Sequence, residues 1–188
     1  MAKTHCGSPE KQSRIDDSVV TAAVTGDKMA LGQIYDAYIN SIYRYHYSCV
    51  GNATDTEDLT SQTFMAVLES LNHYKTRGYF SAWVFRIARN KAMDFFRVQQ
   101  RTVDELPLHL AHNDDVLEMI IKNQTYDELS ALLRSLTEEE LEVLRLRYVA
   151  QLSYVEIANM LGRKEDAVRK SLKRLLERLS SQLEVQNV

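Results

Sequence analysis

Apolar residues recur at three- and four-residue spacing along most of the chain, and no convincing run alternates between apolar and polar residues. The first spacing places apolar side chains on one face of a helix, whereas alternation would indicate a strand. Only two prolines and six glycines interrupt the pattern, so we predict an all-α fold. In the first half of the chain we expect four helices, within residues 16–26, 29–50, 55–71 and 80–98, with breaks at Gly51-Asn52 and between Asn72 and Gly78.

The C-terminal part has the pattern of a helix-turn-helix. Thr137 with Glu140, and Ser153 with Glu156, fit the capping box, in which side chains satisfy backbone N–H groups at a helix start. A short apolar stripe follows Ser153, and Gly162 then supplies a residue that tolerates positive φ. The helix after it has an apolar face of Val168, Leu172, Leu175, Leu176 and Leu179 and an opposite face of Lys170, Lys173, Arg174 and Glu177.

The two helical blocks are separated by an acidic segment. Residues 104–128 contain seven acidic side chains and one lysine, and Pro107 interrupts them, which is typical of a linker. We therefore divide the chain into four parts. These are a polar leader predicted to be disordered (1–14), an N-terminal domain (15–101), a flexible acidic linker (102–123) and a C-terminal helix-turn-helix domain (124–188).

Charge is distributed unevenly although the formal net charge is only -3. Residues 162–179 contain seven basic and three acidic side chains, and residues 77–101 contain six basic and one acidic side chain. Basic side chains neutralise phosphates, and the second helix of a helix-turn-helix enters the major groove of DNA. Basic faces are also common on ordinary solvated helices. It is the combination with the short helix and the glycine turn that favours DNA.

Several other functions lack support in the sequence. Cys6 and Cys49 are too few and too differently placed for a disulfide framework or a zinc site, and we expect His46 beside Cys49 to pack rather than bind a metal. We recognise no phosphate-binding glycine loop and no nucleophile with a positioned base, so we expect no enzyme and no cofactor. The first residues lack the apolar core of a signal peptide, and no stretch approaches the ~20 apolar residues of a membrane span. We expect a soluble, cytoplasmic protein without direct membrane insertion.

The order of the segments resembles a known family. DAYINSIYRY, TEDLTSQTF, FSAWVFRIARNKAMDFFR, an acidic linker and LTEEELEVLRLRYVAQLSYVEIANMLG together resemble the bacterial sigma factors of the extracytoplasmic-function (ECF) group. The resemblance implies an N-terminal domain that binds the clamp of core RNA polymerase and recognises and melts the minus-ten promoter element. It implies a C-terminal domain that reads the minus-thirty-five element, and a linker, from about Val103 to Lys122, that threads through polymerase channels near template and nascent RNA. It also implies an anti-sigma factor, often membrane-anchored, as a further partner.

Carried over by position, the resemblance implies three sets of site residues. The polymerase clamp would be contacted by Asp55, Asp58, Leu59, Ser61 and Gln62. Minus-ten DNA, whose unstacked bases suit aromatic and polar side chains, would be contacted by Tyr74, Tyr79, Arg86, Asn90, Asp94 and Arg97. Minus-thirty-five DNA would be contacted by Arg163, Lys164, Arg169, Lys170, Lys173 and Arg174. The chain departs from the common family pattern at Ser61-Gln62, Arg163-Lys164 and Ser171, and Trp83 is expected in the core.

Three alternatives stay open. A helix-turn-helix regulator would bind operator DNA without polymerase, although the melting-like segment counts against it. An enzymatic function is not supported by any motif that we recognise in the sequence. A sigma-like protein that interacts with other proteins but has lost promoter reading would explain the departures at Arg163, Lys164 and Ser171. The acids that open the helix at Asp55 also have a second explanation, because they stabilise a helix dipole. Since neither domain is strongly basic, we expect the free protein to bind promoter poorly and to gain specificity on polymerase, which raises the effective concentration of both domains.

Overall fold

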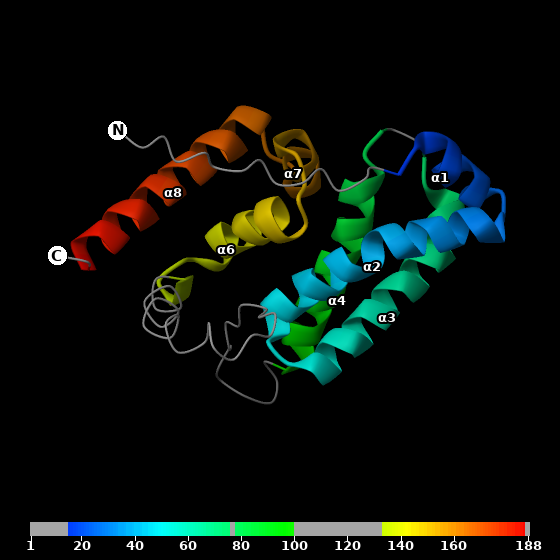
Figure 1. Ribbon diagram of the computed structural model, residues 1–188, viewed down its shortest axis with the longest axis horizontal. Coiled ribbons are helices and arrows are strands. Elements are labelled where there is room, and N and C mark those ends of the chain that lie inside the picture. The colour runs from blue at the N-terminus through cyan, green and yellow to red at the C-terminus, as the bar shows by residue number, and fades with distance from the viewer. Residues whose placement is uncertain (1–14, 76–77, 100–132, 187–188) are drawn as a thin grey trace, which may run out of the picture.

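The computed structural model describes residues 15–75, 78–99 and 133–186, and within these ranges the secondary structure is helical, as predicted. The predicted leader (1–14) and linker (102–123) lie outside the described residues. Within the described ranges no helix is both long enough and apolar enough to cross a membrane. The helices form two groups, α1–α4 and α6–α8, which are drawn in blue to green and in yellow to red (Figure 1).

The N-terminal helical group contains the four predicted helices. Their bounds are α1 (Asp17–Val24), α2 (Lys28–Val50), α3 (Ala53–Ser70) and α4 (Phe80–Gln99), with a short 3₁₀ turn, η1 (Leu71–His73), after α3. Side chains of Asp16, Asp27 and Asn52 cap the first three helices by accepting hydrogen bonds from backbone N–H groups. The predicted break after α2 is confirmed, because Gly51 ends that helix at φ 74°, a conformation that favours glycine.

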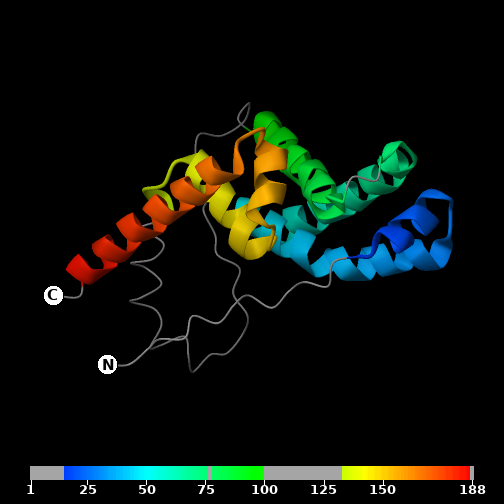
Figure 2. The same ribbon diagram turned by 90° about the horizontal axis from the view of Figure 1, so that it is seen from above.

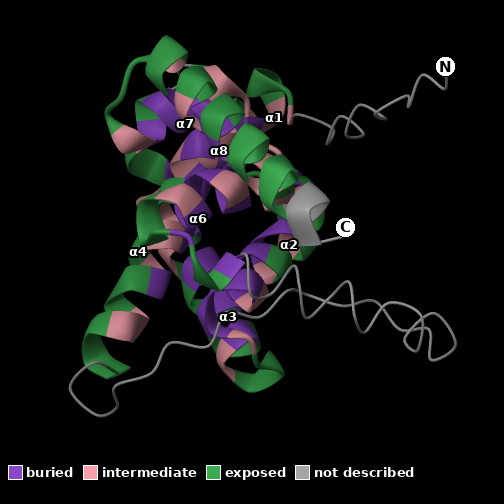
Figure 3. Ribbon diagram, turned by 90° about the vertical axis from the view of Figure 1, so that its left-hand side faces the viewer, coloured by how far each residue is buried: buried purple, intermediate pink, exposed green. Residues whose placement is uncertain are grey.

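The core of this group lies between α2, α3 and α4. Tyr45 and Phe85 are its largest fully buried side chains, and their rings meet edge-on with centroids 5.8 Å apart. Figure 3 shows the buried residues gathered on the inner faces of these helices. The helical spacing of Leu59, Phe64, Val67 and Leu68 in α3 predicts that all four are core residues, and the first three are buried. The expectation that Leu68 is core is wrong: it is 54% exposed, because it lies past the edge of the stripe that faces α2 and α4.

The C-terminal helical group is the predicted helix-turn-helix with one preceding helix. It comprises α6 (Glu138–Leu144), a π-helical turn η2 (Arg145–Val149), α7 (Tyr154–Leu161) and α8 (Glu165–Gln186). Both predicted capping boxes are present, at Thr137 and at Ser153. Gly162 ends α7 with φ 65°, as the turn requires. Ile157, Val168 and Leu172 are buried between α7 and α8, whereas Leu176 is 39% exposed and lies at the margin of the apolar face.

The two helical groups contact each other. α7 packs on α4, and η2 packs on α2, so the helix-turn-helix lies against the long helices of the N-terminal group (Figures 1 and 2).

Candidate nucleic-acid and polymerase interface

One exposed face of α4 carries the residues predicted to bind minus-ten DNA. Arg86, Asn90, Asp94 and Arg97 are all exposed on this helix, whose opposite side is buried through Phe85, Ala88 and Ala92. Arg97 forms an exposed ion pair of 2.7 Å with Asp94 one turn away. Such a pair is worth little in water, so Arg97 is available to a phosphate. The structure therefore places these four side chains on the solvent-facing side of α4.

A hollow of about 440 Å³ opens beside the N-terminus of α4. Its lining includes the predicted residues Tyr74, Tyr79 and Arg86 and also Lys75, which belongs to the loop from Tyr74 to Phe80 that the family resemblance assigns to promoter melting. His73 and Trp83 also line it, and the sequence had not assigned them to a DNA surface. Tyr79 is 40% exposed. Tyr74 and Trp83 are half-buried, and their ring centroids lie 5.0 Å apart. Trp83, which was expected in the core, packs against the core with one side and also forms part of the lining of this hollow.

The aromatic wall is fixed from behind. Phe80 is buried and contacts Tyr74 and Trp83 with centroid distances of 5.1 and 5.5 Å. Phe80 is in turn held by Tyr38, whose hydroxyl is 2.8 Å from Ser81 Oγ. A ring held on a packed support loses little further freedom when a flat ligand stacks on it. The hollow therefore offers exposed aromatic edges and a guanidinium group in a pre-arranged geometry.

The basic side chains of the helix-turn-helix do not form one continuous surface. Arg163, Lys170 and Arg174 line an open groove of about 570 Å³, together with Arg178 and Glu140. Arg178 pairs with Glu140 at 2.8 Å. The groove combines three predicted residues, and Arg178 is an addition that the sequence reasoning missed.

The remaining basic residues of the helix-turn-helix lie elsewhere. Arg169 is held at 2.5 Å by Glu165 and lies over the Tyr154 ring, and Lys173 is 3.7 Å from Glu177. Lys164 is exposed in the turn before α8. The groove lined by Arg163, Lys170 and Arg174 therefore has a net positive charge, whereas Arg169 lies outside it and already has two partners, Glu165 and Tyr154.

The surface of α3 is acidic and polar at its N-terminal end. Asp58, Ser61 and Gln62 are exposed, and they share one side of the helix. Asp55 is half-buried, and its Oδ2 accepts one hydrogen bond of 2.7 Å from Asn52 Nδ2. Leu59 is only 2% exposed, so its side chain supports the helix from inside and does not belong to this surface. Of the five residues predicted to contact the polymerase clamp, Asp58, Ser61 and Gln62 are therefore the ones exposed on this surface.

The sequence of the chain is also similar to a known protein family. The chain matches Sigma-70 region 2 over residues 34–102 and Sigma-70 region 4 over residues 126–179. It is 31% identical over 160 residues to the ECF RNA polymerase sigma factor BldN of Streptomyces coelicolor, a match covering 80% of this chain and 59% of that protein. The chain belongs to the ECF group of the sigma-70 family. Sigma factors of this family direct RNA polymerase to promoters.

Further relatives agree with this assignment. The sigma factor is 29% identical over 176 residues to SigD of Mycobacterium tuberculosis, covering 89% of its own length and 83% of that relative. Among solved structures it is similar to CnrH in complex with the cytosolic domain of CnrY, with a TM-score of 0.68 and 23% identity, over 91% of this chain and 98% of that one. It is also similar to RpoE of Bartonella quintana in complex with the anti-sigma factor NepR, with a TM-score of 0.62 and 18% identity, over 82% and 96%. These two likenesses show a shared fold.

His46 and Cys49 of α2 are packing residues of the sigma factor, as expected. His46 is fully buried and its Nε2 is 2.9 Å from Thr63 Oγ1, and burial lowers the pKa of the imidazole to about 4. Cys49 is 3% exposed, and burial raises the pKa of its thiol to about 12. Among the described residues, no group of three or more His, Cys, Asp and Glu side chains could hold a metal ion.

Proposed function

We propose that this sigma factor contacts core RNA polymerase through α3, recognises and opens minus-ten DNA with α4 and the aromatic hollow, and reads minus-thirty-five DNA with α8. The observation that carries the proposal is the hollow at the start of α4, where Tyr79, Trp83 and Arg86 share one wall. The residue assignments and the domain division into 15–101, 102–123 and 124–188 belong to this proposal.

The hollow suits an unstacked base. A base that leaves the duplex exposes a flat face, which stacks on aromatic rings with about 1–3 kcal/mol per base, and an edge that accepts hydrogen bonds from a guanidinium or amide group. Tyr79 and Trp83 supply rings, and Arg86 and Asn90 supply donors on the same side of α4. Arg97, two turns beyond Asn90, is placed to neutralise the phosphate backbone that leads away from the hollow.

The groove along α8 suits double-stranded DNA. The second helix of a helix-turn-helix lies in the major groove with its N-terminal half near base edges. Lys170 and Arg174 lie in that half of α8, and they line the groove together with Arg163 of the preceding turn. Ser171, where the family resemblance implies a frequent arginine, is half-buried beside them. In this proposal the departure changes which bases the helix reads rather than how it packs.

The α3 surface suits a basic protein partner. Asp58 lies exposed near the N-terminus of α3, a helix that contains no Lys or Arg. Since the chain has a net charge of -3, the two DNA surfaces alone give weak binding, and docking on polymerase supplies affinity by holding both surfaces near the promoter. An anti-sigma factor, as found bound to RpoE of Bartonella quintana, is a further partner in this proposal.

Transcription with bacterial core RNA polymerase tests the proposal. The purified chain is added to core enzyme on a library of genomic fragments, and RNA start sites are mapped. We expect discrete starts that share upstream elements and disappear with Asp58→Arg. Glu69→Arg is the matched control, because it makes the same charge change on an exposed residue at the other end of α3. If core never initiates while the chain alone retains specific fragments, the protein is a conventional helix-turn-helix regulator.

A further inference from the structure

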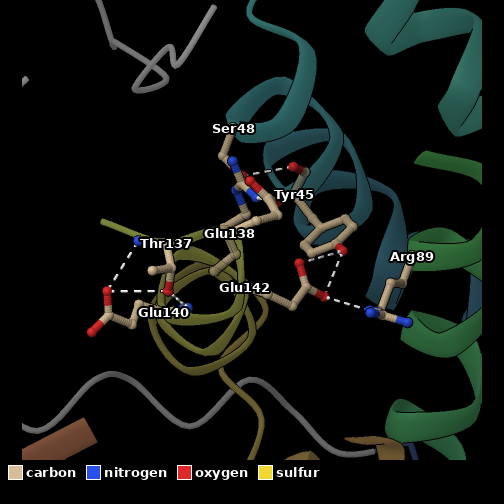
Figure 4. Close-up of polar contacts among 8 residues, drawn as sticks. Tyr45, Ser48, Arg89, Thr137, Glu138, Glu140 and Glu142 are labelled. Atoms are coloured by element: carbon tan, nitrogen blue, oxygen red, sulfur yellow. Dashed lines mark hydrogen bonds and ion pairs between the residues drawn. The ribbon is translucent and has the colours of Figure 1, made fainter. Parts of the chain in front are cut away.

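A buried carboxylate joins the two helical groups. Glu142 of α6 is only 8% exposed. The Tyr45 hydroxyl of α2 donates to its two oxygens at 3.0 and 3.2 Å, and Arg89 Nε of α4 lies 3.2 Å from Oε1. Figure 4 shows the carboxylate of Glu142 between these two side chains. A residue of the C-terminal helical group thus places its charge among donors of the N-terminal helical group.

A second contact lies about one turn before Arg89 on α4. Arg86 Nη2 donates a 2.8 Å hydrogen bond to the backbone oxygen of Asn159 in α7. Asn159 also lines the aromatic hollow, together with Tyr79 and Trp83. Arg86 is one of the donors proposed for minus-ten DNA, and Arg89 borders the same face. The helix-turn-helix therefore occupies part of the surface that promoter DNA requires.

The contact is specific without being strong. Burial raises the pKa of Glu142, and the Tyr45 hydroxyl, Arg145 and Arg89 offset this only in part. Buried ion pairs of this kind define one arrangement but add little net stability, because desolvation offsets the attraction. A cavity of about 310 Å³ lies beside Glu142, lined on its apolar side by Met93, Phe96 and Leu161. Tight interfaces leave few such voids, so separating the two groups has a modest cost.

We propose that Glu142, Tyr45 and Arg89 form a latch that holds the two helical groups in a closed arrangement, in which α7 covers part of the minus-ten surface of α4. The latch opens before α4 binds promoter DNA. This inference rests on the proposed function, because the surface that it covers is the proposed minus-ten surface. The latch adds a second reason, besides the low net charge, to expect weak binding of the free chain to promoter DNA.

Cys49 reports on opening. It is buried one turn after Tyr45 and lines the same cavity as Glu142, so a thiol reagent reaches it when the helical groups separate. Labelling is measured on the full chain carrying Cys6→Ser, which removes the other cysteine of the sequence. We expect Glu142→Gln and Tyr45→Phe each to accelerate labelling about tenfold, since each removes one side of a buried hydrogen-bonded contact.

Three comparisons make the labelling decisive. Glu139→Gln, on an exposed residue of the same helix, makes the same charge change and should label at the wild-type rate. The double variant Tyr45→Phe/Glu142→Gln should label no faster than the faster single variant, because both changes remove the same interaction. Small-angle scattering should show a larger radius of gyration for the latch variants, while circular dichroism shows unchanged helix content. Equal labelling rates in all folded variants would overturn the latch.

A DNA-binding measurement tests whether the closed arrangement covers the proposed minus-ten surface of α4. Binding of fluorescent random-sequence single-stranded DNA is measured by anisotropy at low salt, and Glu142→Gln should bind several-fold more tightly than Glu139→Gln. Equal affinities, with faster Cys49 labelling in Glu142→Gln, would overturn the covering of α4. Failure of the proposed function is a separate result, because it appears as absent initiation by the wild-type chain with core polymerase and does not alter Cys49 labelling.

Discussion

The guanidinium group of Arg169, in the second helix of the helix-turn-helix, lies over the ring of Tyr154 at the start of the first, with Cζ 5.1 Å from the ring centroid. Arg147 lies over the same ring at 4.8 Å. Glu165, one turn before Arg169, completes the arrangement with an ion pair of 2.5 Å. Arg169 is therefore held by cation–π and ionic contacts within the domain, and it reaches DNA only by giving up one of them.

Glu165→Gln should strengthen promoter binding by releasing Arg169. The substitution removes the ion pair and an acidic charge near the DNA phosphates, and we expect affinity to rise about three- to fivefold at low salt, since exposed ion pairs are worth up to ~1 kcal/mol. Asp166→Asn makes the same charge change in the same helical turn and is the control. The extra gain of Glu165→Gln over Asp166→Asn should vanish in an Arg169→Ala background. Equal gains in both backgrounds would show that Arg169 plays no part. Anisotropy with a mapped promoter provides the measurement.

The groove on α8 predicts that its neighbouring basic residues contribute unequally to promoter binding. Lys170→Ala and Arg174→Ala should each weaken promoter binding by the polymerase complex across different sequences and lower the slope of log K against log salt by about 1. Arg178→Ala is the matched comparison and should have a smaller effect, because Arg178 already pairs with Glu140 at 2.8 Å. Titrations between about 50 and 200 mM salt measure the slopes. Identical slopes for the wild type and all three variants would place the DNA on another face.

The aromatic hollow predicts an effect on DNA opening. Tyr79→Ala removes an exposed ring and should reduce initiation on duplex promoters about tenfold, given stacking of about 1–3 kcal/mol per base. On templates with a pre-melted minus-ten region, the loss should be smaller if the ring mainly supports opening. Tyr79→Phe keeps the ring and should retain most activity. Abortive initiation on both templates measures the difference, and full activity of Tyr79→Ala on duplex DNA would remove Tyr79 from the proposed site.

Local features of the fold were predictable because their causes are local. A capping box needs only residues three positions apart, as at Ser153 and Glu156, and the turn at Gly162 needs only one residue that accepts positive φ. The limits of each apolar face were less predictable. Leu68 and Leu176 fit the helical spacing but are exposed, because the width of a buried stripe depends on how closely the neighbouring helices pack, and spacing along one helix does not contain that information.

The contacts between the two helical groups were not predictable from periodicity. Glu142 follows three consecutive glutamates and has the sequence context of a solvated helix start, yet it is buried against Tyr45, 97 positions earlier. Arg86 contacts Asn159 across 73 positions. A single buried carboxylate is stabilised only by partners that the tertiary fold brings to it. The one local signal was Tyr45 itself, a buried tyrosine whose hydroxyl needs an acceptor.

His46 makes the stability of the N-terminal helical group depend on pH. Burial lowers its pKa to about 4 from an ordinary value near 6.5, so the unfolded chain takes up the proton before the folded one does. Stability is therefore full above about pH 6.5 and falls as pH drops towards 4, by up to about 3 kcal/mol. In His46→Gln, whose amide nitrogen can replace Nε2 beside Thr63, this part of the decrease should disappear. Urea unfolding from pH 7 to 4.5, followed through Trp83, the single tryptophan of the chain, measures it. His73→Gln, at an exposed histidine, should keep the wild-type decrease, and an equal decrease in His46→Gln would show that other groups cause it.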